Sequence, residues 1–96
     1  MSITNLGPNT VDHTNIVLAA GRRMFGYMIQ GARETTGRSV EEAARLAAIE
    51  PSEWLAVEAG QIAVNPAWLR PMADALEMPF DQMTALVHLC QFSWPE

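Results

Sequence analysis

The chain has 96 residues, of which 49% are hydrophobic and 18% charged, and its net charge at pH 7 is −5. This composition fits one globular domain with a modest core and excludes an intrinsically disordered chain. Its single cysteine excludes an internal disulfide framework, and no stretch approaches the roughly 18 apolar residues of a membrane-spanning helix. The first residues also lack the basic segment and long apolar stretch of a secretory signal, so we expect a cytoplasmic protein with no membrane association.

The N-terminal third of the chain predicts an arm followed by a long helix. Residues 1–15 are rich in Asn, Thr, Gly and Pro without periodicity, which indicates a flexible N-terminal arm. Thr14 or Asn15 can cap a first helix, because apolar residues then recur every three or four positions as far as Ala32. This helix should end near Gly37, since glycine is a favoured residue just beyond a helix C-terminus.

Four shorter helices are predicted after it. The second begins at Ser39, whose spacing to Glu42 is that of a capping box, and breaks at Ile49. The third covers residues 51–59, with a proline in its first turn and a glycine after its end. The fourth covers residues 65–77, with a local distortion at Pro71, and the fifth covers residues 80–92. No stretch predicts a strand, so the fold class is all-α, with a domain over residues 16–92 and a tail over residues 93–96.

The second and third helices predict a helix-turn-helix. Two short helices joined by three or four residues form the unit that places its second helix in the major groove of DNA. The surrounding sequence resembles the lambda-repressor-like family, also called Cro/CI or XRE. The resemblance rests on four segments: FGYMIQGAR (residues 25–33), GRSVEEAA (37–44), WLAVEAG (54–60) and LRPMADAL (69–76). It implies a five-helix helix-turn-helix domain whose first helix is longer than is usual in the family.

The resemblance also implies roles for particular residues. Arg33 and Glu58 correspond to a pair that forms a structural salt bridge between the first and third helices, and we expect it to be partly buried and bidentate. The positions that read bases in the family fall on Val40, Pro51, Ser52, Glu53 and Ala56. The candidate phosphate contacts are Arg38, Ser39, Gln61 and Asn65. Alternatively, Ser39 only caps its helix and Arg38 is solvated.

These residues are poorly suited to reading DNA. Only Ser52 is a neutral polar reader; Glu53 can accept a hydrogen bond from cytosine but is repelled by phosphates, and Val40 and Ala56 can touch only a thymine methyl group. The chain contains no lysine, and its charge changes from +2 over residues 16–49 to −6 over residues 50–96. Nucleic-acid binders usually present a basic surface, so this charge argues against strong electrostatic capture of DNA.

The first helix has a second candidate surface. Its core-facing register leaves Met24, Tyr27, Met28 and Gly31 nearer the outside, and such a stripe of methionine and small residues suits packing against another helix. It can serve as core for the fifth helix and tail, receive Phe92 and Trp94 of the chain itself, or bind a second subunit.

No motif predicts an enzyme. His88 and Cys90 are two residues apart and have no partner cluster, so they do not make a zinc site. The sequence contains neither a glycine-rich phosphate loop nor a serine or cysteine near a histidine that suggests nucleophilic catalysis. We expect no cofactor and no bound metal.

Two functions remain. The first is a DNA-binding transcriptional regulator of the Cro/CI type, dimeric, which reads double-stranded DNA with residues 51–59 as its recognition helix. The second is a protein-protein interaction module that kept the fold and lost DNA readout. Under either function, a homodimer or a protein partner is expected.

Overall fold

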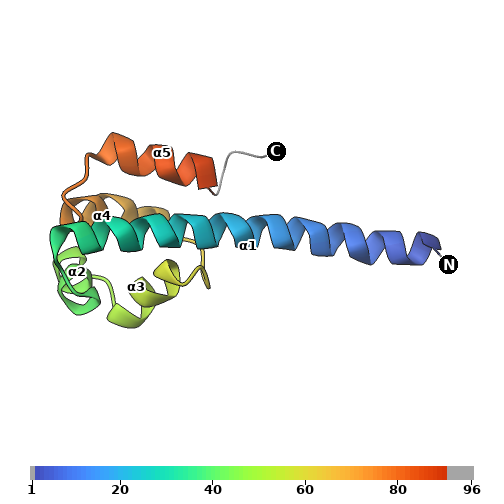
Figure 1. The fold of residues 1–96 in the computed structure, drawn as a ribbon, viewed down its shortest axis with the longest axis horizontal. Helices are drawn as coiled ribbons and strands as arrows, with labels where there is room; N and C mark the ends of the chain where they lie inside the picture. The colour runs from blue at the N-terminus through green and yellow to red at the C-terminus, as the bar shows by residue number, and fades with distance from the viewer. Residues whose placement is uncertain (1, 91–96) are drawn as a thin grey trace.

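The computed structural model describes the backbone of residues 2–90 and the side chains of residues 16–90 (Figure 1). The described elements are α1 (Ser2–Thr36), α2 (Val40–Ala47), α3 (Pro51–Glu58), the short 3₁₀ helix η1 (Pro66–Trp68), α4 (Leu69–Ala75) and α5 (Phe80–Cys90). No strand occurs within residues 2–90. The predicted all-α, five-helix fold is therefore confirmed. No helix in this part of the chain is both long enough and apolar enough to cross a membrane.

The first helix begins earlier than the sequence predicts. Helix α1 starts at Ser2, whereas the capping residues Thr14 and Asn15 suggested a start near residue 16. Both residues are tolerated inside a helix at a cost below about 1 kcal/mol each, so a capping signal alone does not set a helix start. The backbone of residues 2–15 is thus part of α1; that residues 1–15 form a flexible arm is a separate statement about motion and stays a prediction. The other end agrees with the sequence, since α1 ends at Thr36 and Gly37 has a φ of +79°.

The predicted fourth helix is divided into two parts. The side chain of Asn65 accepts a hydrogen bond from the Ala67 N–H at 2.9 Å, which caps η1. Helix α4 then begins at Leu69, and Pro71 lies in its first turn, where a missing N–H leaves no bond within the helix unmade. The distortion expected at Pro71 is therefore found just before it, as a 3₁₀ turn. Helix α5 is described as far as Cys90, so the last two residues of its predicted range and the predicted tail lie outside the described residues.

Helix α1 is the axis of the molecule. Its 35 residues account for the longest dimension, 53 Å, at the usual rise of about 1.5 Å per residue. Helices α2 and α3 lie on one side of α1 and α5 lies on the other, while the N-terminal part of α1 extends beyond them (Figure 1). Helix α3 and helix α5 both contact α1, and α4 joins α2 to α5.

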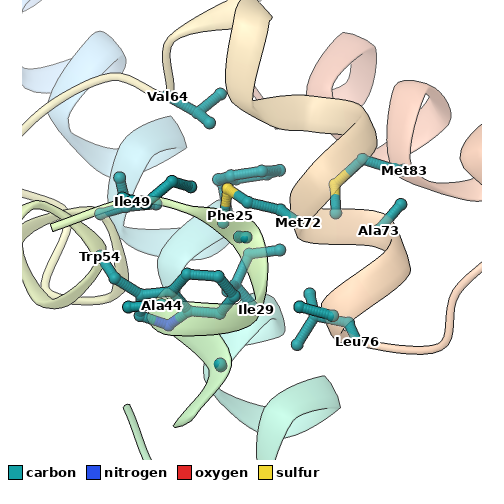
Figure 2. Packing of buried hydrophobic residues seen from close by; sticks show 14 of the residues in the cluster. Phe25, Ile29, Ala44, Ile49, Trp54, Val64, Met72, Ala73, Leu76 and Met83 are labelled. Carbon is teal, nitrogen blue, oxygen red and sulfur yellow. The ribbon is translucent and has the colours of Figure 1, made fainter. Parts of the chain in front are cut away.

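The core lies where these helices meet. Its largest fully buried side chains come from α1, α3, α4 and α5; they are Val57 and, labelled in Figure 2, Phe25, Ile29, Trp54, Met72 and Met83. Three buried alanines, Ala43, Ala44 and Ala47, form the inner face of α2. Their small size allows α2 to pack closely against its neighbours.

Glycines allow α3 to lie directly against α1. A Cβ atom on Gly26 would overlap the carbonyl oxygens of Val57 and Glu58, which belong to the backbone of α3. Gly60 follows α3 with a φ of +74°, and a Cβ there would lie 2.7 Å from the Cα of Arg23. The orientation of α3 is therefore fixed by backbone contact with α1.

Candidate DNA-binding surface

Three residues make the corner between α2 and α3. Ala48 ends α2 in the left-handed conformation with a φ of 58°, and the Ile49 N–H donates to the Ala44 carbonyl at 2.9 Å. The Ile49 side chain turns into the core and is 6% exposed. Glu50 then opens α3, since its carbonyl accepts from the Trp54 N–H at 3.0 Å. This arrangement is a helix-turn-helix corner.

A capping box closes the start of α2. The Glu42 N–H donates to the Ser39 hydroxyl at 3.1 Å, and the Ser39 N–H donates to the Glu42 carboxylate at 2.9 Å. The backbone hydrogen bond from Ser39 lowers the pKa of Glu42 below its ordinary value. Ser39 is exposed, but its hydroxyl already serves its own helix.

An ion pair holds α3 against α1. The Arg33 Nε donates to Glu58 Oε2 at 2.6 Å and its Nη2 donates to Oε1 at 3.0 Å, so the pair is bidentate. The side chains of Arg33 and Glu58 are only 12% and 5% exposed. The hydrogen bond to Glu58 raises the pKa of Arg33 above its ordinary value. The pair that the family resemblance implies is present, and it is structural.

A third residue of this cluster was missed by sequence reasoning. The Trp54 indole N–H donates to Glu58 Oε2 at 2.6 Å, inside the core. The available signal was the spacing of four residues between Trp54 and Glu58, which places both on one face of α3. Arg33 extends the cluster in the other direction, because its Nη1 donates to the Arg38 carbonyl at 2.9 Å. The start of α2 is thereby tied to α1.

The outer edge of α3 faces solvent. Pro51, Ser52 and Glu53 are exposed, Leu55 is 55% exposed and Ala56 is half-buried. The structure therefore brings four of the five positions expected to read bases onto one short helix. The fifth, Val40, is half-buried and packs against the core from the first turn of α2. In the loop that follows α3, Gln61 and Asn65 are exposed, and Asn65 is used as the cap of η1.

Arg38 has a role that the sequence did not predict. Its Nη1 donates to the Ala75 carbonyl at the end of α4 and to the Glu77 carboxylate, both at 2.9 Å. Its side chain is 29% exposed, whereas that of Glu77 is 64% exposed. Arg38 is therefore neither simply solvated nor positioned as an unoccupied phosphate contact. It links the start of α2 to the end of α4.

The charges exposed on α2, α3 and the corner between them are mainly negative. Glu41 lies in the first turn of α2, and Glu50 and Glu53 lie at the start of α3; all three are exposed. Arg45, in the last turn of α2, is an exposed basic residue of this unit. Carboxylates beside a reading helix repel phosphates, so the surface can contribute little non-specific affinity for DNA.

The second candidate surface of α1 is exposed as predicted. Tyr27 is 76%, Met24 58% and Met28 39% exposed, and Gly31 has open space around it. Tyr27, Met28 and Gly31 line one shallow depression, whereas Met24 lines another, next to α5. The four residues therefore lie on one face of α1 but line two separate depressions.

The histidine and cysteine of α5 are not part of a polar cluster. His88 Nδ1 lies 2.9 Å from the Thr84 carbonyl, one turn earlier in the same helix. Cys90 is buried, and this burial raises the pKa of its thiol. Within the described side chains, no group of three His, Cys, Asp or Glu residues comes together that could hold a metal ion.

The geometry defines the class of the protein as a helix-turn-helix domain. The defining features are a three-residue corner, a second helix with an exposed outer edge, and the Arg33–Glu58 ion pair that holds this helix against α1. Comparison with protein families agrees, since the family model of the helix-turn-helix domain matches residues 25–87. The chain belongs to this family, which is part of the Cro/XRE-like group. Neither the curated proteins nor the solved structures include a significant match to the chain.

Proposed function

We propose that this protein is a DNA-binding transcriptional regulator of the Cro/CI type, with α3 as the helix that enters the major groove. One observation carries the proposal. The inner edge of α3 is anchored by Trp54, Val57 and Glu58, while its outer edge, including Ser52 and Glu53, is exposed. A helix held in this way can be inserted into a groove without unfolding any part of the core. Two copies would read the two halves of a palindrome.

The charge of the surface limits how the protein can bind. Arg38 and Arg45 are the two arginines on the helix-turn-helix segment, and Arg38 must exchange Glu77 for a phosphate before it can contribute. Each neutralised phosphate adds about 0.9 to the slope of log affinity against log salt, so we expect a slope of about −2 per subunit. Discrimination between DNA sequences must then come from a few contacts with base edges, in which the Ser52 hydroxyl is the main polar donor and acceptor.

A titration of labelled duplex DNA tests the proposal. Fluorescence anisotropy with a random-sequence duplex pool, at roughly 50 and 200 mM salt, should show weak binding that decreases as salt rises. Glu77→Gln should strengthen this binding, because it frees Arg38 from its ion pair. Asp81→Asn is the matched control: it removes the same charge from α5, on the opposite side of α1 from α2 and α3 (Figure 1), and should change binding less.

A second candidate function has its own observation. Leu46 on α2 and Leu55 on α3 are 58% and 55% exposed, and they lie on the same unit as the exposed Glu41, Glu50 and Glu53. Apolar side chains surrounded by carboxylates suit a protein surface with basic residues better than they suit a phosphate backbone. The protein would then be an interaction module that keeps the fold without reading DNA.

The same titration separates the two candidates. If neither the wild type nor Glu77→Gln binds DNA at the lower salt concentration, the regulator proposal is wrong and the interaction module stands. If Glu77→Gln binds more tightly than the wild type while Asp81→Asn does not, Arg38 contacts phosphate and the interaction module loses its support.

A further inference from the structure

An apolar groove lies between α1 and the end of α5. Five residues of α1 and two of α5 line it: Ile16, Val17, Ala20, Gly21, Met24, Leu89 and Cys90. Its volume is about 350 Å³, and none of these side chains carries a charge. Ile16 and Met24 on its rim are 61% and 58% exposed, although both are large hydrophobic residues.

The groove lies beside the last described turn of α5. Helix α5 lies along α1 and is described as far as Cys90, while α1 continues towards its own N-terminus (Figure 1). Cys90 and Gly21 both line the groove, and both are buried. On α1, the groove residues Ile16, Val17 and Ala20 are all exposed. Residues 91–96 are therefore joined directly to Cys90, a residue that lines the groove.

We propose that this groove is the docking site of residues 91–96 of the same chain, with Phe92 as the side chain that fills it. The lengths agree. An extended chain advances about 3.3–3.6 Å per residue, so Phe92 can reach roughly 7 Å beyond Cys90. From Gly21 back to Ile16, α1 rises about 1.5 Å per residue, or roughly 7.5 Å in all. Phe92 can therefore lie beside Ile16 and Val17.

The chemistry of the segment also fits the groove. Residues 91–94 are Gln, Phe, Ser and Trp, which are uncharged and include two aromatic side chains two positions apart. In an extended segment, residues at this spacing point to the same side. Trp94 can then continue the contact along α1, while Gln91 and Ser93 face the solvent.

The tail is favoured over a second copy of the chain as the occupant. A segment attached directly to the end of the groove has an effective local concentration on the order of millimolar, which does not depend on how much protein is present. A second copy must instead give up translational and rotational freedom, and it would have to displace a segment that is already attached. The docking proposal is independent of whether the protein binds DNA.

Disulfide trapping tests the position of the tail. In a Cys90→Ala background, Ile16→Cys combined with Phe92→Cys should form an intramolecular disulfide under mild oxidation. Non-reducing electrophoresis and intact mass would show an oxidised monomer. Leu46→Cys combined with Phe92→Cys is the matched control, because Leu46 is equally exposed but lies on α2, far from the groove (Figure 1). If disulfide-linked dimers form instead, a second copy of the chain occupies the groove and the proposal is wrong. The proposal is also wrong if the intramolecular disulfide forms with the same yield in the 16/92 pair and in the 46/92 control pair.

A second measurement uses no engineered cysteine. Phe92→Ala with Trp94→Ala should lower Tm by several degrees and increase the binding of a hydrophobic dye, because the groove loses its cover. Gln91→Ala with Ser93→Ala should leave both the Tm and the dye binding unchanged, since under the proposal these two side chains face the solvent and not the groove. If the two double variants behave alike, the tail does not occupy the groove.

Discussion

The carboxylate of Glu58 accepts hydrogen bonds from both Arg33 and Trp54, so one buried group joins α1, α3 and the core. Arg33 Nε and Trp54 Nε1 each lie 2.6 Å from the same oxygen, Oε2, and Arg33 Nη2 bonds the other. Such a group is costly to desolvate and is tolerated only when its hydrogen bonds are made. The position of α3 is thus coupled to the stability of the whole domain.

The first prediction concerns this ion pair. Arg33→Met or Glu58→Leu alone should lower the free energy of unfolding by roughly 3–5 kcal/mol, because each leaves a buried partner charge uncompensated. The double variant should lose less than the sum of the two. Urea unfolding of the four proteins measures the coupling as a double-mutant cycle. Additive losses would mean that the pair does not act as a unit in the folded state.

The second prediction concerns the contact between α1 and α3. Gly26→Ala should destabilise the protein by roughly 1–3 kcal/mol or more, because the new methyl group would overlap two backbone carbonyl oxygens that cannot rotate away. Gly31→Ala, on the same helix, is the matched control. Nothing lies within 4 Å of its added Cβ, so it should stabilise the helix by about 0.5–1 kcal/mol. Thermal unfolding of the pair should therefore give shifts of opposite sign.

The sequence predicted local features well because their signals lie close together in the chain. The capping box of Ser39 and Glu42 spans three residues, and Gly37 marks the end of α1. The Arg33–Glu58 pair spans 25 residues and was available only through the family resemblance. Without the family resemblance, nothing in the sequence would have predicted that Arg33 and Glu58 form an ion pair.

The sequence could not predict the contacts of Arg38. Its partners Ala75 and Glu77 are 37 and 39 residues away, and one of them is a backbone carbonyl that any residue type could supply. The N-terminal extent of α1 was missed for a different reason. Thr14 and Asn15 are good caps but also tolerable helix residues, so their local signal is ambiguous.

The third prediction concerns pH. Because the pKa of Glu42 is lowered by folding, its contribution to stability is present above the unfolded value of about 4.5 and is lost as pH falls through the folded pKa. Glu42→Gln keeps an acceptor for the Ser39 N–H but carries no charge. The wild type should therefore have the higher Tm at pH 7, and the difference should shrink as pH falls below about 4.5. A difference that stays constant down to pH 3 would contradict this assignment.

The fourth prediction concerns the corner itself. Ala48 has a φ of 58°, a left-handed conformation that costs a residue with a Cβ roughly 1–2 kcal/mol and costs glycine almost nothing. Its side chain is exposed, so its removal forfeits little packing. Ala48→Gly should raise the free energy of unfolding by about 0.5–1 kcal/mol, since the strain it relieves exceeds the extra entropy that glycine gains when unfolded. Ala59→Gly, at the end of α3, is the control, because Ala59 has a φ of −80° and gains nothing from glycine. It should destabilise the protein, and a loss of stability in both variants would mean that the turn between α2 and α3 is not closed through a left-handed residue.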